Sequence, residues 1–182
     1  MKIGGKIYAI VCLMGLVSVA IGGIAAYAIN EYNNTIVELE HDEERVHLGE
    51  RLNRYVASVA MEARGIYMSP TREAAEPYAA AVMRYLGEID RVIDEWRPLI
   101  DEHTSAAFDV VDRQTQDFRS FRSTIVDISR RDGPVAAASF GNSEVNNSKR
   151  RAYSAAIDEL VAIDQKRLDD FRVEILEFER TM

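Results

Sequence analysis

The chain is poor in the residues that build catalytic and metal-binding sites. It has a single cysteine, Cys12, so no disulfide can form within the chain and a CxxCH haem attachment is excluded. Its three histidines, His41, His47 and His103, show neither HExxH nor any other metal-ligand spacing. The sequence also lacks a recognisable Ser-His-Asp set and a glycine-rich phosphate loop. We therefore expect no enzymatic activity, no catalytic residue, no metal and no cofactor.

Glycine and proline are scarce beyond residue 30. That part of the chain contains five glycines (49, 65, 87, 133 and 141) and four prolines (70, 77, 98 and 134). So few turn-forming residues favour long helices over an all-β chain. The formal net charge of −8 makes nucleic acid an unsuitable partner, because its backbone is itself negative.

Residues 7–30 form an uncharged and mostly apolar run. A helix needs about 20 such residues to cross a bilayer. Lys2 and Lys6 precede the run and Glu31 and Glu38 follow it, so the positive-inside bias places the N-terminus in the cytoplasm. We predict a cytoplasmic N-terminus at 1–6, a transmembrane helix at 7–30 and a periplasmic domain at 31–182.

The same run permits a second interpretation. Ala26-Tyr27-Ala28 fits the cleavage site of a signal peptide, although the run is longer than such peptides need. Either way the rest of the chain is exported. Within the run Ser18, Gly22 and Ala26 recur every four residues, a spacing that lets two membrane helices approach closely and hints at a dimer.

Beyond the run, apolar residues recur with the rhythm of amphipathic helices in four segments. The four stripes are Leu52, Val56, Val59, Ala63 and Ile66; Tyr78, Val82, Tyr85, Ile89, Val92 and Trp96; Phe108, Val111, Thr115, Phe118, Arg122 and Ile125; and Tyr153, Ile157, Leu160, Asp164, Leu168 and Phe171. Asp164 interrupts a stripe that is otherwise apolar.

Turn-forming residues separate the four segments. Ser69-Pro70 predicts the cap and first residue of the second helix, Pro98 ends or bends that helix, and Asp132-Gly133-Pro134 ends the third. Residues 135–140 allow a short extra turn, and Ser143 is the expected cap of the last helix. Short turns make successive helices antiparallel. The sequence thus predicts an all-α fold, with an N-terminal transmembrane helix followed by an antiparallel up-down-up-down four-helix bundle.

The last stripe continues to the final residues, EFERTM, without a stop signal. We expect the chain to be the N-terminal piece of a longer protein, followed by a second membrane helix and a cytoplasmic part. A complete, singly anchored protein is the alternative.

Three stretches resemble the sensor region of bacterial methyl-accepting chemotaxis proteins, those of alphaproteobacteria above all. They are MEARGIYMS (61–69), the 96–128 run with its core QDFRSFR, and GNSEVNNSKRRAYSAAIDEL (141–160). The resemblance covers essentially the whole chain. It implies an inner-membrane receptor for chemotaxis signal transduction with a periplasmic four-helix sensor domain. The HAMP linker and the cytoplasmic signalling hairpin of such receptors are not in this sequence, and some histidine kinases and cyclases carry the same sensor module.

Arg64, Tyr67, Asn146 and Arg150 are the candidate ligand-binding residues. In an antiparallel bundle the end of the first helix and the start of the last lie at a similar height, and Gly65 permits a close approach between them. Guanidinium groups bind carboxylates bidentately, so these residues suit a small anion between those two helices. The alternative is that they cap and solvate the end of the bundle.

We therefore expect a homodimeric transmembrane receptor that signals by small helix displacement. Its partner is a small anionic ligand or a periplasmic binding protein. A sensor attached to a histidine kinase or cyclase is one alternative, and a ligand-free membrane-anchored helical scaffold is another.

Overall fold

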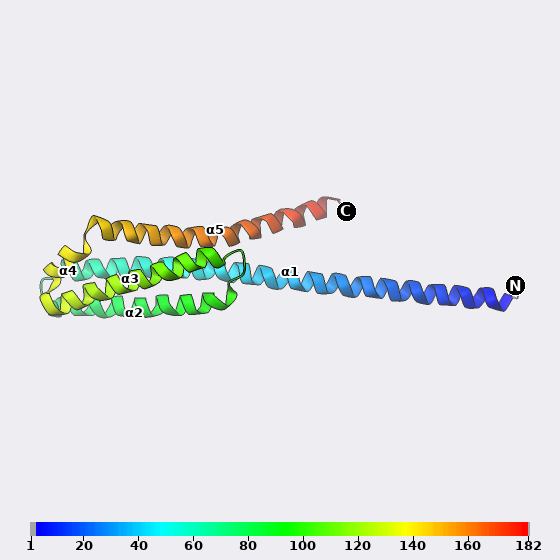
Figure 1. Ribbon diagram of the computed structural model, residues 1–182, viewed down its shortest axis with the longest axis horizontal. Helices are drawn as coiled ribbons and strands as arrows, with labels where there is room; N and C mark the ends of the chain where they lie inside the picture. The colour runs from blue at the N-terminus through cyan, green and yellow to red at the C-terminus, as the bar shows by residue number, and fades with distance from the viewer. Residues whose placement is uncertain (1–2, 182) are drawn as a thin grey trace. The chain divides into compact units, whose positions relative to one another are not determined.

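The computed structural model describes residues 3–181, and this part of the chain is helical almost throughout, with no strand. Five α-helices and one short 3-10 helix follow one another: α1 (Ile3–Met68), α2 (Arg72–Trp96), η1 (Arg97–Leu99), α3 (Ser105–Asp132), α4 (Pro134–Gly141) and α5 (Glu144–Thr181) (Figure 1). The predicted all-α class is confirmed.

The structure divides into two compact units, Met1–His41 and Asp42–Met182. The first unit contains the stretch Cys12–Asn30, whose mean hydropathy is 2.1 and whose residues are all exposed. By length and composition this stretch is able to cross a membrane, as the sequence predicts. The membrane itself and the two sides assigned to it stay predictions.

The helix ends follow the expected stop signals with one correction. Ser69 does not cap the second helix: its hydroxyl donates to the Gly65 carbonyl at 2.8 Å, within the last turn of α1. Thr71 is the cap, because its extended backbone lets its hydroxyl accept from the Ala74 amide at 3.2 Å. Proline at position 70 therefore precedes α2 and is not its first residue.

The later boundaries agree with the sequence. Pro98 lies in η1, directly after α2 ends, and Gly133 ends α3 with a positive φ of 99°, a conformation that favours glycine. The extra turn expected after Gly133 is α4. Ser143 precedes α5, and its hydroxyl accepts a long hydrogen bond of 3.4 Å from the Asn146 amide.

In the second unit one apolar core is shared by α1 from residue 42 onward, α2, α3 and α5. Most of its members come from the predicted stripes, others such as Leu86 and Val126 lie beside them, and α4 adds Ala137. Tyr78 of the second stripe is instead exposed. The most deeply buried large side chains include Leu52, Ile66, Leu86, Trp96, Ile125 and Ile157. Within this unit the long helices lie side by side and alternate in direction along the chain (Figure 1).

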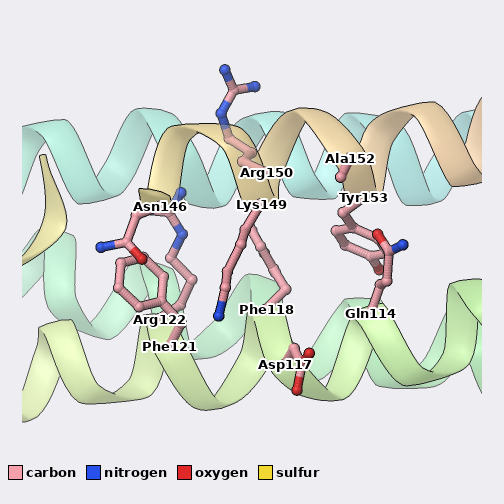
Figure 2. A pocket seen from close by; sticks show the side chains of 10 residues that line it. All are labelled: Gln114, Asp117, Phe118, Phe121, Arg122, Asn146, Lys149, Arg150, Ala152 and Tyr153. Atoms are coloured by element: carbon pink, nitrogen blue, oxygen red, sulfur yellow. The ribbon is translucent and has the colours of Figure 1, made fainter. Parts of the chain in front are cut away.

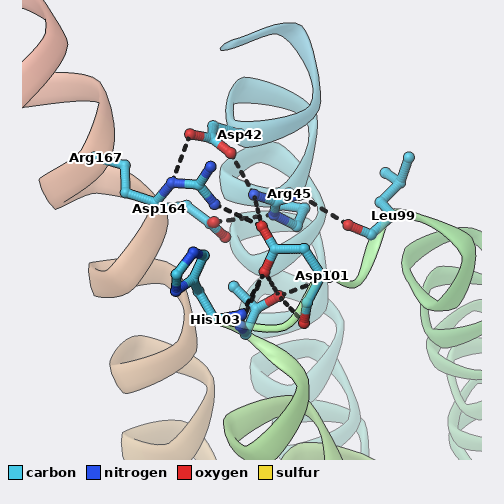
Figure 3. Close-up of polar contacts among 8 residues, drawn as sticks. Asp42, Arg45, Leu99, Asp101, His103, Asp164 and Arg167 are labelled. Atoms are coloured by element: carbon cyan, nitrogen blue, oxygen red, sulfur yellow. Dashed lines mark hydrogen bonds and ion pairs between the residues drawn. The ribbon is translucent and has the colours of Figure 1, made fainter. Parts of the chain in front are cut away.

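A buried ion cluster ties three parts of this unit together near η1 (Figure 3). Arg45 of α1 donates to Asp164 of α5 at 2.9 Å, to the Leu99 carbonyl at 2.8 Å, and to Asp42. Arg167 of α5 binds Asp101 at 2.6 Å and Asp42 at 3.3 Å. Asp164, which interrupts the apolar stripe of its helix, is thus the buried partner of an arginine.

The charges of the cluster affect one another strongly. Burial raises the pKa of Asp164 to about 6, although Arg45 favours the ionised form. By contrast the pKa of Asp101 lies well below its usual range: burial opposes this, but hydrogen bonds from Thr104 and Arg167 outweigh it. One carboxyl in the cluster therefore titrates near neutral pH and another stays ionised.

Candidate functional site

A pocket of about 240 Å³ lies between the middle of α3 and the first turns of α5 (Figure 2). Phe118, Phe121 and Tyr153 provide its aromatic walls. Its polar lining consists of Gln114, Asp117, Arg122, Asn146, Lys149 and Arg150. Two of the predicted site residues, Asn146 and Arg150, therefore line one pocket, which lies against α3 and not, as expected, between the first and last long helices.

The aromatic walls result from the buried stripes of the two helices. On α3 the stripe residues Thr115, Phe118 and Arg122 are buried, and on α5 Tyr153 is buried opposite them. The Tyr153 hydroxyl forms a hydrogen bond of 2.6 Å with the Thr115 hydroxyl, which anchors one end of the pocket. The rings of Phe118 and Tyr153 lie 5.3 Å apart between centroids.

Arg122 is the most unusual residue of the pocket. It is only 7 % exposed, and its Nε atom is buried without a hydrogen-bond acceptor. No carboxylate of the described residues lies within ion-pair distance of it. Its guanidinium carbon instead lies 5.1 Å from the centroid of the Phe118 ring and 5.3 Å from that of the Phe121 ring. A buried charge without a counter-charge is costly and rare in proteins.

The surroundings of Arg122 add to that cost. Burial lowers the pKa of Arg122 and the positive charge of Arg150 lowers it further, although the adjacent Tyr67 hydroxyl acts in the opposite direction. An arginine side chain nevertheless keeps its proton in a folded protein. The site is therefore a permanent cation without an ion-paired carboxylate among the side chains that the structure describes.

Tyr67 lies behind Arg122, near enough for the guanidinium to lower the pKa of its hydroxyl against the larger opposite effect of burial. The net effect is a raised pKa. The hydroxyl is buried and has no hydrogen-bond partner. Its ring end lies so close to Gly141 that a Cβ there would collide with it. Tyr67 supports Arg122 from behind but does not line the pocket.

Arg64 is exposed and does not line this pocket. Its neighbour Gly65 has a packing role, since a Cβ at that position would collide with the ring of Tyr78 on α2. A ligand-binding role for Arg64 stays a prediction that this pocket does not support.

Asn146 and Arg150, the two predicted site residues on α5, are oriented differently from their neighbour Lys149. The Asn146 amide donates to the Phe140 carbonyl at 2.9 Å, which holds the turn between α4 and α5. In Figure 2 the guanidinium of Arg150 points away from α3, whereas Lys149 extends across the pocket toward α3. Lys149 is therefore better placed than Arg150 to meet a bound anion.

Sequence reasoning missed Arg122 and Lys149 as site residues. Arg122 carried a usable signal, because a charged residue at a stripe position faces the interior and needs a partner. Lys149 carried none, since it sits in a basic cluster that a solvated helix face also explains.

Among the residues searched for metal sites, no group of three or more His, Cys, Asp or Glu side chains is close enough to hold an ion.

No protein-family model matches the chain, and neither a curated protein nor a solved structure matches it significantly.

Proposed function

We propose that the chain is the ligand-sensing part of a transmembrane receptor, most simply a bacterial chemoreceptor that works as a homodimer. In this proposal residues 31–182 form a periplasmic antiparallel four-helix bundle, anchored by the apolar residues 7–30. The apolar stretch Cys12–Asn30 and the single core shared by four helices support it. The protein binds and transmits, and it has no catalytic step.

The observation that carries the proposal is the uncompensated charge of Arg122. A helical scaffold gains little from a buried guanidinium without an ion-pair partner, and an apolar side chain of similar size would cost less. Residues that break the rules of stability in this way concentrate at functional sites. Because Arg122 lines a pocket, a small anion that enters from solvent supplies the missing counter-charge.

The proposed mechanism is a small displacement of α5. An anion held between Arg122 on α3 and Lys149 on α5 favours the packing in which these two helices are closest. A ligand shifts the equilibrium between two packings only by the difference in its affinity for them. Helix shifts of about 1–2 Å are a known switching mode.

The ion cluster gives this displacement a route along the unit. Arg45 binds Asp164 and fixes α5 to α1 near η1. A buried ion pair resists separation because each charge would be left unpaired. A change in the position of α5 is therefore passed to α1 at the cluster and not absorbed within the core.

Other outputs are compatible with the same sensor. A histidine kinase or cyclase in place of the chemotaxis signalling part would leave the pocket and its ligand unchanged. A periplasmic binding protein would act on the outer surface and would not need Arg122. A ligand-free scaffold gives no reason for the buried charge, which is why we rank it last.

A receptor fusion tests the proposal. Residues 1–182 are joined to a second membrane helix and the cytoplasmic part of a chemoreceptor, in bacteria without other receptors. Small organic acids are added and the activity of the chemotaxis kinase is recorded. We expect at least one acid to change kinase activity, and we expect Arg122→Met to abolish that response.

Arg113→Met is the matched control, because Arg113 is an exposed residue of the same helix that does not line the pocket. It should leave the response intact. Alkaline phosphatase joined after residue 182 of the natural chain should be active, since that enzyme needs export. A fusion that is inserted in the membrane but responds to no acid, or responds equally with Arg122→Met, would contradict direct anion sensing.

A further inference from the structure

We propose that the pocket between α3 and α5 takes a small carboxylate whose body is a single apolar ring. This inference rests on the proposed function, in which the pocket binds an anion, and it specifies the chemical class of that anion.

The charge balance of the pocket selects an anion without an amino group. Three cationic side chains line it, Arg122, Lys149 and Arg150, against one carboxylate, Asp117. In Figure 2 the Asp117 carboxylate points away from Lys149 and toward the outside of α3. An ammonium group on the ligand would therefore meet Lys149 and Arg122 before it met a carboxylate, and like charges at that range repel.

The buried cation selects a carboxylate among anions. The guanidinium carbon of Arg122 lies over the rings of Phe118 and Phe121, and these contacts leave its N–H groups free to bind an acceptor. A planar carboxylate matches that fork with two parallel hydrogen bonds.

The walls select an apolar, flat body. Phe121 is stacked on Phe140 of α4 at 5.3 Å with an interplanar angle of 29°, which holds its ring in place. The Phe118 ring packs against the Tyr153 ring. Rings prefer offset-stacked or edge-to-face partners, and such contacts add to the gain from burying apolar area. A ring between these side chains is better matched than a flexible polar chain.

The size of the pocket admits a ligand that contains one ring. At roughly 30 Å³ for each water molecule, 240 Å³ corresponds to about eight waters. Benzoate, with one ring and one carboxylate, is of that size.

The test uses the full chain in lipid nanodiscs and three probes. Benzoate carries both the ring and the charge, benzamide has the ring without the charge, and acetate has the charge without the ring. Isothermal titration should show benzoate binding, with benzamide and acetate each about 10- to 100-fold weaker, since each lacks one half of the recognition.

Variants of the same protein locate the site. Arg122→Met should weaken benzoate about 10- to 100-fold and leave benzamide unchanged. Arg122→Lys should bind benzoate more tightly than Arg122→Met but less tightly than the unmodified protein, because an ammonium lacks the planar fork of a guanidinium. Phe121→Leu should weaken benzoate and benzamide alike, and the exposed control Arg113→Met should change neither.

The outcomes separate this inference from the proposed function. Equal binding of benzoate and benzamide, or full benzoate affinity in Arg122→Met, would overturn the inference. So would tighter binding of acetate than of benzoate, although the receptor fusion could still respond to another anion through Arg122. Binding of benzoate that never changes kinase activity in the fusion would support the ligand class and contradict the sensor.

Discussion

Removing the charge of Arg122 should make the ligand-free protein more stable. The change is Arg122→Met, which keeps an unbranched side chain of similar length in the same buried position. Replacing even a paired buried ion by well-packed apolar side chains is often neutral or stabilising by about 1–4 kcal/mol, and a lone buried ion lacks the attraction that offsets part of its desolvation. Because Arg122 is 7 % exposed and has an unsatisfied Nε, it belongs to the class in which this gain applies.

The loss of the cation–π contacts of Arg122 reduces this gain in stability. Arg122 contacts the rings of Phe118 and Phe121, and cation–π contacts contribute about 0.5–1 kcal/mol each at exposed sites and more when desolvated. A methionine sulfur also packs well against aromatic rings, so part of that contribution returns. The net expectation is a stabilisation of about 1–2 kcal/mol. For a unit of this size that is a rise in melting temperature of about 2–8 °C.

Trp96 makes the measurement selective. It is the single tryptophan of the chain, it is fully buried in the core of the second unit, and it does not line the pocket. Its fluorescence therefore reports the unfolding of that unit and not events in the apolar segment. The full chain is dialysed extensively to remove bound anions and heated in nanodiscs, with Arg113→Met as the control that should stay within about 0.5 kcal/mol.

The opposite result would refute the reasoning. Breaking a buried ion pair by removing one partner costs about 3–5 kcal/mol. If Arg122→Met lowered the melting temperature by a corresponding amount, the guanidinium would have a counter-charge in the folded protein. The pocket would then need no anion, and the argument for a ligand site would fail at its first step.

Three further predictions concern the ion cluster, a close helix contact and a helix cap. The folded pKa of Asp164, about 6, lies above the unfolded value of 3.8, so the folded protein binds this proton more tightly. Stability should therefore rise by about 1 kcal/mol between pH 8 and pH 5, a rise that Asp164→Asn removes in urea titrations at the two pH values. Gly49→Ala should destabilise by about 1–3 kcal/mol and shift the Trp96 emission, because its Cβ would meet Val161 and lie 3.0 Å from the Trp96 ring. Gly87→Ala, which meets nothing within 4 Å, should be neutral or slightly stabilising, and equal effects of the two would contradict the close contact. Thr71→Ala should lower thermal stability by about 1 kcal/mol and Ser69→Ala by less, the reverse of what a cap at Ser69 would give.

Much of the fold could be predicted from local signals. The apolar run, the 3–4 rhythm and the stops at Pro98 and Gly133 identified the helices within a few residues. The cap before α2 was misplaced because Ser69 and Thr71 are both good caps. Only the extended backbone at Thr71 and the hydrogen bond of Ser69 back into α1 distinguish them.

The candidate site was predicted only in part. Asn146 and Arg150 do line a pocket, and Tyr67 lies beside it, but Arg64 faces solvent. The glycine next to Arg64 has a packing role, since Gly65 leaves space for the Tyr78 ring. Spacing along one helix indicates which residues share a face, but it does not indicate which neighbouring side chain that face meets.

The sequence by itself determined the helical class, the order and approximate ends of the helices, and the apolar stretch near the N-terminus. These depend on contacts within a few residues and on composition, which the chain carries locally. The tertiary structure alone decided that Arg122 is buried without a counter-charge while Asp164, an equally conspicuous interruption of its stripe, is paired with Arg45. Both appear in the sequence as one charged residue in an apolar stripe. Which of them finds a partner depends on the packing of residues about a hundred positions apart in the sequence, as with Arg45 and Asp164. A pattern of neighbouring residues does not predict such a contact.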